Sequence, residues 1–89
     1  MMTEEQFREY AEKKARRRQL ENQLESWAGH HRDAKAMEAA RLLWLGCPTL
    51  ATSQLQQVNG PLKQGAQQFV QEIEEICLGI RLQPPGGKP

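Results

Sequence analysis

Residues 61–78 carry the clearest amphipathic pattern in the chain. Apolar side chains recur at intervals of three and four: Leu62, Ala66, Phe69, Val70, Ile73, Ile76, Cys77 and Ile80. The other side of the pattern is polar and rich in glutamine: Gln64, Gln67, Gln68 and Gln71. This spacing predicts a helix over residues 61–78 with one buried face. Pro61 suits its first turn, and Gly79 suits the position just past its end.

The start of the chain predicts a long helix over residues 3–28. Thr3 and Gln6 have the spacing of a capping box, in which each residue satisfies a free N–H group of the other. From there to Ala28 the residues are mostly strong helix formers, and none of them breaks a helix. Gly29 is the first interruption, so we expect the helix to end before it.

A second helix is predicted over residues 33–45. Asp33 is a suitable N-cap, and Gly46 is a suitable stop signal. A short link between this helix and the first one suits two antiparallel helices. The pattern leaves one alternative open, a single continuous helix over residues 3–45 in which Gly29 is tolerated.

The remaining segments complete an all-α prediction. Thr49 can cap a short helix over residues 49–58, ahead of the turn signal Asn59-Gly60-Pro61. Residues 83–89 are rich in Pro and Gly and have nothing to bury, so we expect a flexible tail. No alternating pattern is long enough for a strand. We therefore predict one domain over residues 1–82, a bundle of three to four helices built on an αα-hairpin.

The apolar residues exceed what one small chain can enclose. The first helix carries two apolar groups. One consists of Phe7, Tyr10 and Ala11, and the other, which points about 120° away, consists of Leu20, Leu24 and Trp27. The run Leu42–Leu45 is apolar on nearly all sides, which predicts burial on several of them. A domain of 89 residues buries only about 60% of its unfolded surface. We therefore expect self-association, as a homodimer, or a permanent protein partner.

Charge and composition narrow the function classes. The 89 residues hold 12 Lys and Arg against 11 Asp and Glu, a net charge of +1, so no global field attracts nucleic acid or lipid. No apolar run approaches a membrane span, and no signal-peptide pattern is present, so we expect a cytoplasmic protein. Cys47 and Cys77 are too few for a disulfide framework, and we interpret them as reduced thiols rather than one disulfide.

The densest charge cluster lies between residues 13 and 18. Its cations are Lys13, Lys14, Arg16, Arg17 and Arg18. They are the candidates for a nucleic-acid contact, because cations on a helix can bind phosphates and Tyr10 is close by for stacking. We nevertheless favour the interpretation that these cations form an ordinary solvated helix face. Glutamates stand four residues from several of the cations, and the cations spread over about 200° of the helix.

Residues 33–58 also fit a helix-turn-helix layout loosely. The segment that would read bases carries polar side chains: Thr52, Ser53, Gln54, Gln56 and Gln57. No Lys or Arg occurs between Arg41 and Lys63, however, so this segment lacks the phosphate contacts that supply most of the affinity. We therefore disfavour this layout.

No catalytic constellation is recognisable in the sequence. His30 and His31 are adjacent and would diverge by about 100° on a helix, whereas a helical metal pair needs spacing of four. Neither a phosphate-cradling glycine loop nor the context of a strained nucleophile is present. We expect no enzyme, no metal, no cofactor and no small-molecule substrate.

The sequence therefore favours a protein that works by binding another protein through apolar helix faces. Trp27 and Trp44 are the expected anchors, because tryptophan dominates binding hot spots. Phe69, Val70 and Ile73 are expected to close the bundle in the same assembly. Adaptors, regulators and stoichiometric inhibitors of a larger protein all fit, and a nucleic-acid-binding protein is the alternative.

Overall fold

The computed structural model describes residues 2–79 as an all-α fold without strands. Its elements, in chain order, are α1 (Glu4–His31), α2 (Ala34–Trp44), α3 (Pro48–Leu55), the short 3-10 helix η1 (Gly60–Leu62) and α4 (Lys63–Ile76). The predicted small helical bundle is confirmed. The predicted tail over residues 83–89 and the predicted domain end at 82 lie outside the described residues.

The start of α1 follows the capping box expected from the sequence. The backbone N–H of Gln6 donates to Thr3 Oγ1 at 3.1 Å, and the backbone N–H of Thr3 donates to Gln6 Oε1 at 3.0 Å. The first turn also carries Glu4 and Glu5, whose negative charges favour the positive end of the helix dipole.

The end of α1 differs from the prediction. The helix runs through Gly29 to His31 and ends at Arg32, which adopts a left-handed backbone with φ of 54° and donates its N–H to the Ala28 carbonyl. A glycine inside a helix costs only about 1 kcal/mol, and the added turn places the His31 ring against Trp27, 5.5 Å away between centroids. The chain turns after Arg32, and Asp33 Oδ1 accepts the Ala36 N–H at 3.0 Å, so the continuous helix over residues 3–45 is not formed.

The later helices keep their predicted places with shifted ends. α3 begins at Pro48 rather than Thr49, because proline supplies the backbone angle of a first helical turn. It ends at Leu55, three residues before the predicted boundary at 58. In the predicted segment 61–78, a 3-10 turn precedes α4, and Gly79 has the positive φ of 71° that suits a residue after a helix.

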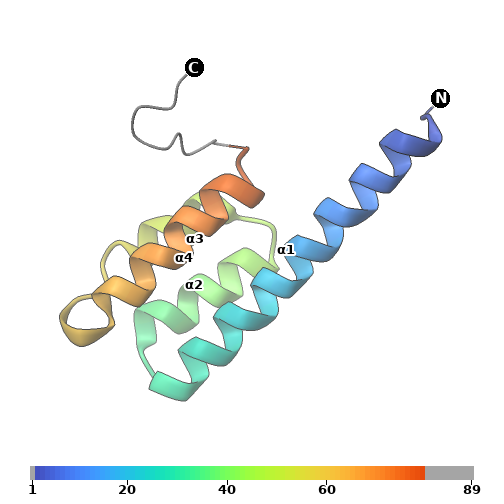
Figure 1. Cartoon of the computed structure of the whole chain (residues 1–89). Coiled ribbons are helices and arrows are strands. Elements are labelled where there is room, and N and C mark those ends of the chain that lie inside the picture. The colour runs from blue at the N-terminus through green and yellow to red at the C-terminus, as the bar shows by residue number, and fades with distance from the viewer. Residues whose placement is uncertain (1, 80–89) are drawn as a thin grey trace.

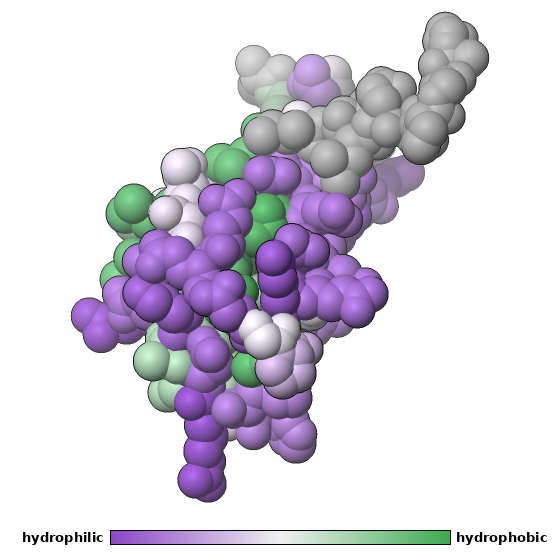
Figure 2. All heavy atoms as spheres, turned by 90° about the vertical axis from the view of Figure 1, so that its left-hand side faces the viewer, coloured by the Kyte–Doolittle hydropathy of each residue, from purple (hydrophilic) through white to green (hydrophobic). Residues whose placement is uncertain are grey.

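Each helix packs against its neighbours in chain order, and α4 returns to α1 (Figure 1). The core lies between the four helices and comprises Leu20, Leu24, Ala28, Ala36, Ala39, Leu43, Ala51, Leu55, Val58, Ala66, Val70 and Ile73. Several of these residues are alanines, whose short side chains allow helix backbones to approach closely. The face turned to the viewer in Figure 2 is mainly hydrophilic, with hydrophobic side chains in smaller areas.

The N-terminal half of α1 extends beyond the bundle (Figure 1). Every side chain from Glu4 to Arg16 is exposed, whereas Leu20 and Leu24 further along the helix are buried. At 1.5 Å per residue this segment, residues 4–16, is about 20 Å long; we call it the overhang. The two apolar groups expected on the first helix therefore lie in different places, one inside the bundle and one on the overhang.

None of the helices in the described part of the chain combines the length and the apolar character that crossing a membrane requires.

Candidate interaction surface

The two tryptophans occupy different environments. Trp27 is half-buried against the bundle, with its ring 5.2 Å from Phe69 and 5.5 Å from His31 between centroids. Trp44, the last residue of α2, is 67% exposed. Trp27 therefore works as a packing residue within the chain, and Trp44 is the tryptophan that is free to contact a partner.

The other predicted anchors belong to the bundle. Val70 and Ile73 are buried in the core, and Phe69 is partly buried where it meets Trp27. These three residues close the bundle from α4 and offer a partner little or no apolar surface in this conformation. Of the five residues expected to bind a partner, only Trp44 presents a large exposed apolar surface.

Gly65 leaves the space that Trp27 occupies. A Cβ atom built on Gly65 would lie 2.9 Å from Trp27 Cζ2, which is too close for real atoms. We expect Gly65→Ala to displace the indole of Trp27 and shift its fluorescence. The overpacking should destabilise the fold by about 1–3 kcal/mol, and the higher helix propensity of alanine offsets part of that loss. Gly29→Ala is the matched control, because its Cβ would meet nothing within 4 Å. It should stabilise the fold by about 0.5–1 kcal/mol in chemical denaturation. Equal effects of the two substitutions would contradict this packing.

Exposed apolar side chains lie on the overhang and at the end of α2. Phe7 is 62% exposed and Tyr10 is 55% exposed on the overhang, and Leu45 is 62% exposed beside Trp44 at the end of α2. The run Leu42–Leu45 was expected to be buried on several sides, but only Leu43 is fully buried. Within residues 2–79, Trp44 and Leu45 are mostly uncovered, because the bundle ends there.

A groove of about 680 Å³ runs between α1 and α2 on the same side as these residues. Its lining comes from α1 (Arg18, Glu21, Asn22, Glu25, Ala28, Gly29) and from α2 (Met37, Ala40, Arg41, Trp44). Met37 is 51% exposed, so both large apolar side chains on the α2 side, Met37 and Trp44, are open to solvent. The groove can therefore hold apolar side chains of a partner.

The groove continues the apolar face of the overhang. Glu25 follows Phe7 by eighteen residues, about five turns of an α-helix, and so points in the same direction. Residues Phe7, Ala11, Lys14 and Arg18 are spaced four, three and four apart along this face, and Arg18 already lines the groove. We call this surface the docking stripe: Phe7, Tyr10, Ala11, Lys14 and Arg18, leading into the groove beside Trp44 and Met37.

The docking stripe was only partly visible in the sequence. The spacing of Phe7 and Tyr10 indicated an apolar face that the bundle does not use. The contribution of Met37 and Leu45 was missed, because the sequence does not show which side of α2 faces solvent. The shared direction of Phe7 and Glu25 follows from helical periodicity alone, because both residues lie inside the helix predicted over residues 3–28.

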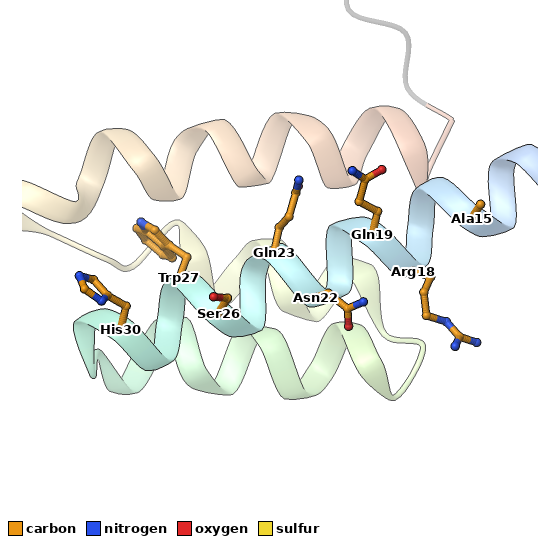
Figure 3. A pocket seen from close by; sticks show the side chains of 8 residues that line it. All are labelled: Ala15, Arg18, Gln19, Asn22, Gln23, Ser26, Trp27 and His30. Atoms are coloured by element: carbon orange, nitrogen blue, oxygen red, sulfur yellow. The ribbon is translucent and has the colours of Figure 1, made fainter.

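A second hollow lies along the outer face of α1 (Figure 3). All eight lining residues, among them Ala15, Asn22 and Ser26, come from α1 itself. In Figure 3 Trp27 projects toward α4, whereas Arg18 points away from it. The hollow is therefore an open strip of helix surface, without a second wall that would enclose a small molecule.

The basic cluster surrounds α1 at the base of the overhang. Lys13, Lys14, Arg16 and Arg18 are exposed, whereas Arg17 is half-buried. Arg17 lies close to Cys77 at the end of α4: burial raises the pKa of the Cys77 thiol, and the Arg17 guanidinium opposes that rise. Four of the five cations are thus open to an anionic partner, and the fifth is engaged with the bundle.

The cysteines and histidines form no cluster in the described residues. Cys47 and Cys77 are free thiols. The rings of His30 and His31 meet edge to face at 4.8 Å between centroids, and His31 also packs on Trp27. Within residues 2–79 no three His, Cys, Asp or Glu side chains are placed to hold a metal ion.

The helix-turn-helix layout has its polar side chains engaged within the chain. Thr52 is buried, and its hydroxyl donates to the Thr49 carbonyl at 2.8 Å. Gln57 accepts from Lys35 Nζ at 2.9 Å and donates to the Ser53 carbonyl at 3.3 Å. Two of the five side chains expected to read bases therefore have partners in the protein itself.

Comparison with known proteins adds no relative to this picture. No family model, no curated protein and no solved structure matches the chain. The functional argument therefore depends on the docking stripe and its chemistry.

Proposed function

We propose that this protein is a non-enzymatic interaction module of the cytoplasm that binds a protein through its docking stripe, as an adaptor, a regulator or a stoichiometric inhibitor. The observation that carries the proposal is the overhang: Phe7 and Tyr10 stand on a helix beyond the bundle, in line with a groove beside Trp44. Large aromatic side chains of this kind are the residues that dominate binding hot spots.

The stability of the overhang supports the same proposal. Every side chain of residues 4–16 is exposed in the part of the chain that the structure describes, and helices of about 12–15 residues are marginal in water without tertiary contacts. The capping box at Thr3 contributes about 1 kcal/mol, which offsets part of the ordering cost. Burial of Phe7 and Tyr10 against a partner would supply the remaining stabilisation, so binding and helix formation reinforce each other.

Site-specific photo-crosslinking in cells tests the proposal. A benzophenone amino acid in place of Tyr10 should give a discrete crosslinked protein product, and adding Phe7→Asp should abolish it. Gln68, exposed on α4 away from the docking stripe, is the matched control position and should give no such product. Equal products from positions 10 and 68, or none from either, would overturn the proposal.

A nucleic-acid partner is the second candidate, favoured by the four exposed cations of the basic cluster and by the exposed Tyr10 nearby. The test is the fluorescence anisotropy of mixed oligonucleotides. Micromolar binding at about 50 mM salt that falls tenfold at about 200 mM would support this candidate, because phosphate contacts weaken steeply with salt. The proposed protein-binding function predicts no binding at either salt concentration.

A further inference from the structure

We infer that the docking stripe pairs with a second copy of this chain, the two overhangs lying antiparallel. The inference rests on the proposed function and names the partner. It follows from three features of the described residues: the charge order along the overhang, the order of aromatic and cationic side chains on the docking stripe, and the position of the exposed residues Trp44 and Leu45.

The charges along α1 are arranged so that the segment complements itself in the antiparallel direction. Residues 4–12 hold four glutamates and one arginine, whereas residues 13–18 hold five cations and no acid. A parallel pair would place the cations of one copy beside those of the other. An antiparallel pair through the docking stripe places Glu4, the acidic residue nearest to this face of the helix, beside Arg18 of the partner copy, which lowers repulsion and fixes the direction.

The side-chain types along the docking stripe also change from its outer end to the end near the bundle. Phe7 and Tyr10 form its outer half, and Lys14 and Arg18 form the half nearer the bundle. In the antiparallel arrangement the aromatic rings of one copy lie over the cationic side chains of the other. Cations over aromatic faces attract each other, by about 0.5–1 kcal/mol at exposed sites and more when desolvated. The methylene stems of Lys14 and Arg18 cover the rings as well.

The antiparallel pair also covers the apolar residues at the end of the bundle. Because the overhang is about 20 Å long, its tip reaches the base of the partner's overhang, where Arg18 and Trp44 line the groove. Each copy uses the same surface, so the contact is two-fold and closes on itself as a dimer. Trp44 and Leu45 then meet the first turns of the partner's α1.

The available surface suits a small, specific dimer. Such an interface buries about 1,200 Å² or more in total. Phe7, Tyr10 and Trp44 are each more than half exposed, and an aromatic side chain buries about 150–250 Å². Six such side chains from two copies supply several hundred Å². Leu45, Met37 and the stems of Lys14 and Arg18 provide the rest.

Sedimentation velocity over a range of concentrations tests the inference through charge reversal. The wild-type chain should sediment as a dimer that dissociates on dilution. Glu4→Lys, and separately Arg18→Glu, should each raise the dissociation constant about tenfold or more, because like charges then face each other. Both substitutions in one chain should lower the constant again toward the wild-type value, since antiparallel pairing again opposes unlike charges.

The matched control is Glu72→Lys with Glu75→Lys, a reversal of two exposed charges on α4 that should leave the dissociation constant unchanged. Far-ultraviolet circular dichroism confirms that each variant keeps its helices. A wild-type chain that stays monomeric at every concentration, or a chain with both substitutions that dimerises more weakly than either single variant, overturns the inference. The proposed function is judged separately: a different protein crosslinked at position 10 would uphold it while excluding the self-pairing, and no product at position 10 would exclude both.

Discussion

Leu24→Ala should lower the free energy of unfolding by about 2–5 kcal/mol. Leu24 is fully buried on α1 and belongs to the core cluster between the four helices. Truncation removes its transfer free energy and leaves a cavity, because helices held on several sides relax only partly into the space. A domain of this size has about 5–15 kcal/mol of stability, so this one change removes a large share of it.

Urea denaturation followed by circular dichroism at one fixed protein concentration measures this loss. Leu50→Ala is the matched control, because Leu50 is exposed on α3 and its truncation should change stability by less than about 0.5 kcal/mol. If Leu24→Ala lowered the free energy of unfolding no more than Leu50→Ala does, that result would contradict the placement of Leu24 in the core.

Trp27→Ala should lower the free energy of unfolding by about 3 kcal/mol, whereas Trp44→Ala should leave it within about 0.5 kcal/mol. Trp27 fills the space beside Gly65 and packs on Phe69, while Trp44 is two-thirds exposed at the end of α2. The dissociation constant of the dimer should respond in the opposite order: among chains that remain folded, Trp44→Ala should raise it more than Trp27→Ala does. Equal losses of stability in the two variants would contradict the separation of their roles.

The starts of α1 and α2 were predictable from the sequence because caps are local, whereas α3 and α4 begin without a side-chain cap. Thr3 with Gln6, and Asp33 with Ala36, satisfy free N–H groups within one turn, and the structure confirms both. The stripe of α4 was equally clear, because Ala66, Val70 and Ile73 recur at three and four. These features require only neighbours along the chain, so tertiary structure does not change them.

The end of α1 and the roles of the two tryptophans were not predictable in the same way. Gly29 carries a modest local penalty, and the helix continues through it to His31, whose ring packs on Trp27. Trp44 follows two leucines and Trp27 follows Glu25 and Ser26, and neither local context shows which indole ring the bundle covers. Gly65, thirty-eight residues away from Trp27, is what makes one of them a packing residue.

The sequence predicted that the candidate site would be an apolar protein-binding surface, but it predicted only some of the residues that form this surface. The sequence indicated an unused apolar face at Phe7 and Tyr10, and the structure leaves both side chains exposed. The groove between α1 and α2 depends on how two helices pack, and no pattern within either helix specifies it. The basic cluster was assigned to phosphates as the alternative; its position beside the docking stripe is the observation that suggests antiparallel pairing.

Amide hydrogen exchange of residues 5–16, measured from low micromolar to millimolar concentration, tests the central claim most directly. The account predicts fast exchange in the dilute monomer, where the described part of the bundle leaves the overhang exposed, and protection that rises with concentration as the docking stripe is covered. Phe7→Asp should remove that protection while leaving the protection of Leu24 and its core neighbours unchanged. Fast exchange of the overhang at every concentration would contradict the pairing of two copies through α1.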